Sequence, residues 1–92
     1  MLVVDDNSFN LNIFERMLLD TNCTVLKALG GEKALELISK HDDIDVGFFD
    51  INMPIMDGFE LMKQTNIYLS KQNRVRFPIY SLTGDTTERT ME

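Results

Sequence analysis

The 92-residue sequence is poor in the residues that disulfide-bonded and zinc-thiolate proteins depend on. Its single cysteine, Cys23, excludes an internal disulfide and has no companion at the spacing of a zinc site, so we expect a half-buried structural thiol. Apolar runs are only a few residues long, which excludes a transmembrane helix. The first residues also lack the basic start and long apolar region of a signal peptide. These absences favour a cytoplasmic domain.

Basic residues are scarce as well. Nine Lys and Arg stand against fifteen Asp and Glu, which gives a formal net charge of -6. Because a nucleic-acid backbone needs a basic face, we do not expect direct nucleic-acid binding. The acidic balance suits a site that gathers carboxylates around a cation. With 43% hydrophobic and 26% charged residues, the composition is that of one small globular domain.

Short apolar segments alternate with helical patterns along the chain. We expect strands at residues 1–4, 23–28, 46–49 and 78–83, and helices at about 8–18, 34–40 and 58–70, with a further helix beginning near 86. This alternation predicts βαβ units with right-handed crossovers, and therefore an α/β fold whose mainly parallel sheet is covered on both faces.

Several local expectations follow from the helix patterns. Ser8 is predicted to cap the first helix, and His41 to lie at the end of the second, where a cationic side chain complements the helix dipole. Asp57 is predicted to cap the third helix, paired with Glu60 in a capping box. An apolar stripe on the first helix is expected to be core; it consists of Phe9, Ile13, Phe14, Met17 and Leu18.

Polar side chains stand at the carboxyl ends of three predicted strands. Asp5 and Asp6 follow the first strand, Asp50 follows the third, and Thr83 ends the fourth. In open α/β sheets the carboxyl ends of the strands form the ligand-binding edge, so these residues should converge there. An ionised carboxylate buried without a partner is costly, which makes Asp50 the first functional candidate.

Three carboxylates close together raise one another's pKa unless a cation joins them, and Mg2+ prefers oxygen ligands. We expect Asp6 and Asp50 to bind Mg2+ directly, Asp5 to bind it through water, and the Asn52 backbone carbonyl to add an oxygen. An Asp50 oxygen can then attack a phosphoryl group and form an acyl phosphate. The Thr83 hydroxyl can donate to the new phosphoryl oxygens and so sense them.

Three segments, LVVDDN at 2–7, DINMPIMDG at 50–58 and SLTG at 81–84, resemble the receiver domains of response regulators and hybrid histidine kinases. The resemblance covers almost the whole chain. It implies a flavodoxin-like doubly wound sheet in the order 2-1-3-4, with Mg2+ held by Asp5 and Asp6. It also implies that Asp50 is phosphorylated by a phosphohistidine on a histidine kinase or phosphotransfer protein, and that Thr83 couples this event to a rearrangement of the following loop. Such a domain catalyses its own phosphorylation at most and is not a stand-alone enzyme.

The sequence also departs from that family. Receiver domains carry a lysine at the end of a fifth strand, followed by a fifth helix, whereas every lysine here precedes the fourth strand. We therefore expect residues 1–92 to be a receiver domain incomplete at the C-terminus and at the N-terminus. Its fourth strand would be an open edge that favours self-association, and its first helix would expose apolar surface.

Three alternatives fit the sequence less well than a phosphorylated receiver domain. A receiver-like interaction module that is not phosphorylated fits the missing lysine, although the acid pair, Asp50 and Thr83 argue against it. A phosphatase of the haloacid dehalogenase type requires an acid two residues after the nucleophile and a threonine two further on, where this chain has Asn52 and Pro54. A calcium-binding loop starting at Asp50 is disfavoured because Ile55 and Leu61 occupy its glycine and bidentate-acid positions.

Overall fold

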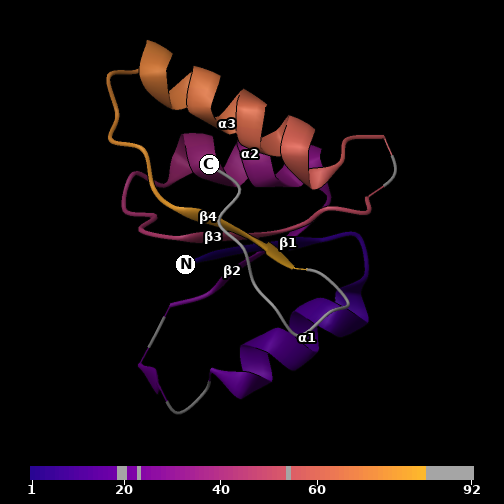
Figure 1. The fold of residues 1–92 in the computed structure, drawn as a ribbon. Coiled ribbons are helices and arrows are strands. Elements are labelled where there is room, and N and C mark those ends of the chain that lie inside the picture. The colour runs from indigo at the N-terminus through magenta and orange to yellow at the C-terminus, as the bar shows by residue number, and fades with distance from the viewer. Residues whose placement is uncertain (19–20, 23, 54, 83–92) are drawn as a thin grey trace.

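The computed structural model describes residues 1–18, 21–22, 24–53 and 55–82. Its strands β1 (Leu2–Asp5), β2 (Leu26–Leu29), β3 (Gly47–Asp50) and β4 (Ile79–Leu82) form one parallel sheet in the order β2-β1-β3-β4. Helix α1 (Ser8–Met17) covers one face of the sheet, and α2 (Gly31–Lys40) and α3 (Gly58–Lys71) cover the other (Figure 1). The predicted doubly wound fold and its strand order are confirmed.

The predicted strand bounds differ by one to three residues from those observed. β2 begins at Leu26 and not at 23, because its pairing with β1 begins at Leu2 and Leu26. Hydrogen bonding to the neighbouring strand, more than the β-branched character of Thr24 and Val25, decides where β2 starts. Cys23, Thr83 and the predicted helix near 86 lie outside the described residues.

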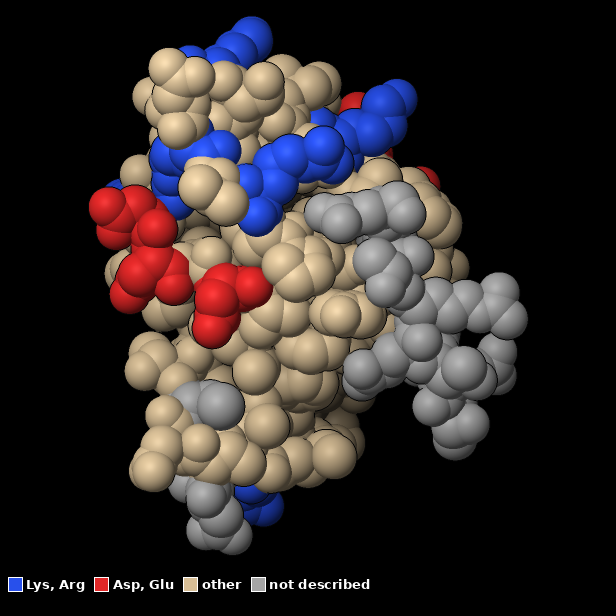
Figure 2. Space-filling model, turned by 60° about the vertical axis from the view of Figure 1, so that its left-hand side comes forward, with Lys and Arg blue, Asp and Glu red and all other residues tan. Residues whose placement is uncertain are grey.

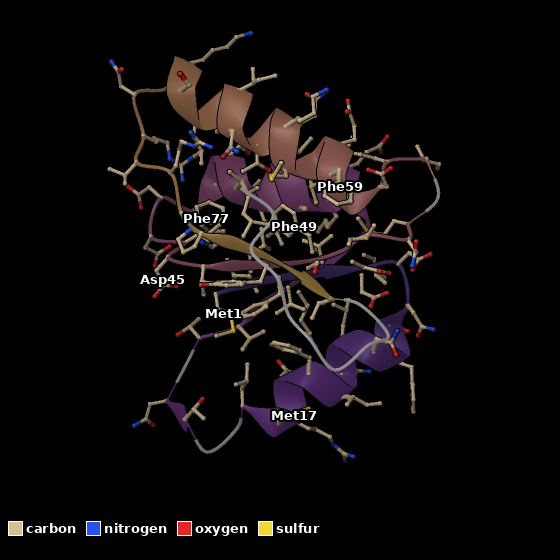
Figure 3. The ribbon with its side chains drawn as sticks, viewed as in Figure 1. Met1, Met17, Asp45, Phe49, Phe59 and Phe77 are labelled. Atoms are coloured by element: carbon tan, nitrogen blue, oxygen red, sulfur yellow. The ribbon has the colours of Figure 1, made fainter. Side chains whose placement is uncertain are left out.

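The core lies between the sheet and the two helices α2 and α3. Phe49 of β3 is fully buried there, and Phe77 packs beside it (Figure 3). Gly47 makes room for both rings, since a Cβ at that position would lie 3.0 Å from Phe49 and 3.1 Å from Phe77. A glycine inside a strand therefore has a packing reason here. The other core residues are Leu2, Val4, Ala28, Ala34, Ile38, Met53, Leu61, Leu69 and Ile79.

Helix α1 differs from its prediction in two respects. Its N-cap is Asn7 and not Ser8, because the Asn7 side chain accepts a hydrogen bond from the Phe9 N–H at 2.9 Å. The apolar stripe is not core: Leu11 is the buried residue of α1, whereas Phe9 and Met17 are 68% and 74% exposed. Periodicity identifies an apolar side of a helix but not what covers it. The expectation that α1 exposes apolar surface is confirmed.

The start of α3 and the end of α2 match the sequence predictions more closely than α1 does. The Asp57 carboxylate accepts a hydrogen bond from the Glu60 N–H at 2.8 Å, so the predicted N-cap of α3 is confirmed. The Glu60 side chain instead accepts from Gln64, so the reciprocal half of the capping box is not formed. His41 is the C-cap of α2, at the helix end where it was expected.

The segment after α3 holds the end of α2. Asn73 has φ 53°, and the Arg74 N–H turns back to bond α3, which is the pattern of a Schellman C-cap. The Arg74 guanidinium then donates to the carbonyl of Ile38 at 2.7 Å and to that of His41, with its Cζ 5.8 Å from the centre of the Tyr68 ring. The sequence suggested solvation for the basic residues of this segment; Arg74 is instead a cap for α2.

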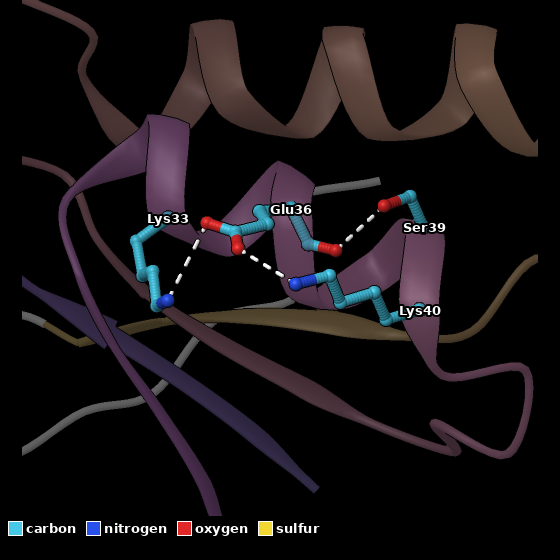
Figure 4. A network of polar contacts seen from close by, with 4 residues as sticks. All are labelled: Lys33, Glu36, Ser39 and Lys40. Atoms are coloured by element: carbon cyan, nitrogen blue, oxygen red, sulfur yellow. Dashed lines mark hydrogen bonds and ion pairs between the residues drawn. The ribbon is translucent and has the colours of Figure 1, made fainter.

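Charges of both signs occupy the surface away from the carboxyl edge of the sheet. Figure 2 shows a band of basic side chains beside a group of acidic ones, and a pocket at the amino edge is lined by Asp45 and Arg76 among others. On α2, hydrogen bonds from Lys40 and Lys33, at 2.9 and 3.4 Å, hold the pKa of Glu36 below its ordinary value (Figure 4). In the described part of the chain, no helix has the length and apolar character needed to span a bilayer.

Candidate functional site

Three carboxylates meet at the carboxyl edge of the sheet. Asp5 and Asp6 come from the end of β1 and Asp50 from the end of β3, and one oxygen of each lies within 4.8 Å of the others. Val4 is paired with Phe49 in the parallel register, so Asp5 and Asp50 follow as the next neighbours. The structure thus brings together three of the residues singled out in the sequence.

Asp5 is the most buried of the three acids, with 5% of its surface exposed. Its Oδ1 accepts a hydrogen bond from the Asn7 N–H at 3.0 Å, and its Oδ2 accepts one from the Asn10 amide at 3.3 Å. Burial raises the pKa of the Asp5 carboxyl above its ordinary value, and the nearby Asp50 charge adds to this, while the two hydrogen bonds oppose it. The cost of burying an ionised carboxylate is therefore greatest at Asp5, and not at Asp50 as the sequence suggested.

Asp50 is only half-buried, and the chain just after it fixes the carboxylate. Its Oδ1 accepts a hydrogen bond from the Asn52 N–H at 3.1 Å, the pattern by which aspartate side chains stabilise turns. Within the described residues the other oxygen receives no hydrogen bond. Asn52, whose carbonyl was predicted as a metal ligand, lies in the same turn with its side chain exposed. The Asn52 backbone thus holds one Asp50 oxygen, and the other oxygen is available to react.

The start of α3 packs directly on the Asp50 backbone. The Gly58 N–H donates to the Ile51 carbonyl at 3.2 Å, and a Cβ on Gly58 would lie 2.6 Å from the Asp50 carbonyl oxygen. Gly58 is therefore needed because the two backbones approach closely, and its φ is not in the left-handed region. The position of α3 and the position of Asp50 are coupled through this contact.

A pocket of about 300 Å³ opens beside the acids. Asp5, Asn10 and Asp50 provide its polar wall. The remaining wall is apolar and comes from α1 and β4: Leu11, Ile13, Phe14, Met17 and Leu82. The pocket thus offers a small polar group access to Asp50 next to an apolar surface.

The donor set suits a hard cation. The carboxylates at the described site offer oxygen atoms and the cluster includes no histidine or cysteine, which matches Mg2+ better than zinc or copper. Carboxylates only 4.8 Å apart repel one another, and a divalent cation would remove that repulsion. The residues present therefore fit a magnesium ion.

Sequence reasoning missed the two asparagines that hold Asp5. Asn7 lies in the LVVDDN segment, but the sequence predicted no role for it and none for Asn10. The available signal was a polar side chain five residues after an acidic strand end, in the first turn of the helix that follows. On a helix that starts beside that strand, such a residue can reach back to the acid.

Comparison with known proteins agrees with this geometry. The family model for the response regulator receiver domain matches residues 1–92. Hybrid signal transduction histidine kinase L from Dictyostelium discoideum is 38% identical over 87 residues, which are 92% of this chain. The chain spans only 5% of the length of that kinase.

Two solved structures have the same fold. The Vibrio cholerae chemotaxis protein CheY4 superposes with a TM-score of 0.79 and 32% identity, over 94% of this chain and 68% of that one. The receiver domain of the histidine kinase CKI1 from Arabidopsis thaliana, solved in complex with Mg2+, has a TM-score of 0.80 and 27% identity, over 94% and 68% of the two chains. From its sequence, fold and site, the chain belongs to the response regulator receiver domains of two-component phosphorelays.

Proposed function

We propose that Asp50 is the phosphoacceptor of this receiver domain and takes a phosphoryl group from a phosphohistidine on a histidine kinase or phosphotransfer protein. The observation that carries the proposal is the convergence of three carboxylates within 4.8 Å, with one oxygen of Asp50 fixed by the Asn52 N–H at 3.1 Å. Similarity to a hybrid histidine kinase supports this class of donor.

The two oxygens of Asp50 have different tasks in this mechanism. The Asn52 N–H holds Oδ1 and so orients the carboxylate, and Oδ2 attacks the phosphorus atom. The new O–P bond forms as the P–N bond to the donor imidazole breaks, and the imidazole nitrogen keeps the electron pair and takes a proton from solvent. The product is an acyl phosphate on Asp50 and a neutral histidine on the donor.

The acids around Asp50 prepare the site for the incoming charge. Asp6 and Asp50 would hold Mg2+ directly, with the Asn52 carbonyl as a further oxygen. Asp5 would act through water, which agrees with the hydrogen bonds that both its oxygens already accept. When bound, Mg2+ supplies positive charge that neutralises the carboxylates and the oxygens of the transferred group.

Thr83 completes the proposal as the residue that senses the phosphoryl group. It lies outside the described residues, but in the sequence it directly follows Leu82, which is paired with Asp50 in the sheet register. A hydroxyl at that point of the chain can donate to a phosphoryl oxygen on Asp50 and couple phosphorylation to the segment that follows.

Intact mass spectrometry tests the proposal. The protein is incubated with Mg2+ and a small-molecule phosphodonor such as acetyl phosphate, beside the variants Asp50→Asn and Asp57→Asn. We expect one added phosphoryl group on the wild type and none on Asp50→Asn. Asp57→Asn makes the same chemical change in a helix cap that asparagine also fills, so its phosphorylation should be unchanged.

Two results would contradict the proposal. Persistent Mg2+-dependent labelling of Asp50→Asn would assign the nucleophile to another residue. A folded wild-type protein that stays unmodified would favour the receiver-like interaction module.

A further inference from the structure

The first turn of α1 holds both oxygens of one acid in the cluster. The Asn7 N–H donates to Oδ1 of Asp5 at 3.0 Å, and the Asn10 side chain donates to Oδ2 at 3.3 Å. An ionised carboxylate can only accept hydrogen bonds, so Asn10 must present its NH2 group to Asp5. Within the described residues, Asp50 accepts one such bond and Asp6 accepts none.

We propose that Asn10 is a positioning residue for the metal site, acting through Asp5. By occupying Oδ2, Asn10 keeps the Asp5 carboxylate in the orientation in which it serves the cation through water, and it leaves direct binding to Asp6 and Asp50. The inference rests on the proposed function and adds to it a residue outside the acid cluster. Groups that orient metal ligands in this way commonly change metal affinity when they are removed.

The place of Asn10 in the fold supports this role over a purely structural one. Asparagine is a poor residue for a helix interior, and Asn10 is exposed, so it contributes little to the core. Its side chain lines the same pocket as Asp5 and Asp50. Asn10 therefore connects α1 to the polar wall of the site.

Asn12, two residues further along α1, provides the matched control. Its side chain lies toward β2 and not toward the acids, and it accepts a hydrogen bond from Lys27 of that strand at 3.3 Å. Asn10→Ala and Asn12→Ala make the same chemical change and the same change in helix propensity. Only the first removes a donor from the acid cluster.

The experiment titrates each protein with Mg2+ alone in a calorimeter, after unfolding midpoints have shown that the variants are folded. We expect Asn10→Ala to bind Mg2+ about 10-fold more weakly than the wild type, and Asn12→Ala to bind it as the wild type does. In the phosphodonor assay, the Mg2+ concentration for half-maximal rate should rise by the same factor in Asn10→Ala. The rate at saturating Mg2+ should stay close to that of the wild type.

The outcomes separate this inference from the proposed function. If Asn10→Ala and Asn12→Ala bind Mg2+ equally well, the inference is overturned, while Mg2+-dependent phosphorylation of the wild type still upholds Asp50 as phosphoacceptor. If the wild type neither binds Mg2+ nor becomes phosphorylated, the proposed function fails and the inference with it. Should Asn10→Ala fail to fold, Asn10→Leu, which has a similar shape and no amide, takes its place in the same comparison.

Discussion

Replacing Gly58 by alanine tests whether the start of α3 sets the position of Asp50. The added Cβ would lie 2.6 Å from the Asp50 carbonyl oxygen and 3.0 Å from the Ile51 Cα, and both neighbours are backbone atoms. To reach ordinary contact at 3.4 Å, the two segments must separate by about 0.8 Å. A shift near 1 Å at a reacting group can cost about 100-fold in rate, so we expect phosphorylation to slow by about 10- to 100-fold.

The same substitution should also destabilise the fold. Forcing a methyl group into packed backbone costs about 1–3 kcal/mol, and the better helix propensity of alanine returns at most about 1 kcal/mol. We therefore expect a net loss of about 1–2 kcal/mol in the free energy of unfolding.

Gly31→Ala is the matched control, because Gly31 is likewise the first residue of a helix. Its Cβ would also approach a neighbour to 2.6 Å, but that neighbour is the Sδ atom of Met56. A thioether side chain can rotate away, so we expect both stability and phosphorylation rate to stay close to those of the wild type.

Urea unfolding followed by circular dichroism measures the stability of both variants, and intact mass spectrometry at fixed Mg2+ and phosphodonor gives their initial phosphorylation rates. If Gly58→Ala matched Gly31→Ala in both measurements, the close approach of α3 would not position Asp50. A loss of stability without a loss of rate would refute only the coupling to the site.

Two further predictions concern the remainder of the fold. Arg74→Met keeps an apolar stem but leaves the two helix-end carbonyls without their charged donor, so we expect a loss of about 2–4 kcal/mol in urea unfolding. Arg76→Met, two residues on at an exposed position, should change stability by less than about 0.5 kcal/mol, and equal effects would rule out the capping role of Arg74. The outer edge of β4, which pairs only with β3 in the described part of the chain, is expected to promote self-association. Sedimentation velocity should then show a concentration-dependent increase in mass, and a monomer at all concentrations would contradict this expectation.

The position of the acid cluster could be predicted because it depends on topology. Strand ends are marked in the sequence by an apolar run that stops at an acid, as at Asp5 and Asp50. Parallel pairing then brings those ends to one edge without any knowledge of side-chain packing. The same reasoning applies to the cap at Asp57, which depends only on residues three positions apart.

The features that sequence reasoning missed depend on contacts between elements. Arg74 bonds to carbonyls 33 and 36 residues away, so no local pattern distinguishes it from a solvated arginine. The stripe on α1 was wrongly predicted as core because helical periodicity does not reveal which apolar residues meet the sheet. Leu11 is buried against the sheet, whereas Phe9 and Met17 are mostly exposed; Figure 3 labels Met17 on α1.

The alternation of β3 explains how one strand can serve both the core and the site. Gly47 and Phe49 are buried, with the Phe49 side chain in the core beneath α2 and α3, whereas Phe48 and Asp50 face α1 and are half-buried. The buried side anchors the strand against a closely packed core, so the Asp50 backbone is held without using its carboxylate. The half-buried side, where the Phe48 ring lies 5.3 Å from that of Phe14, leaves the Asp50 oxygens accessible from the pocket. A change at Asp50 should therefore alter the chemistry with little effect on the fold, whereas a change at Phe49 on the opposite face should act on stability first.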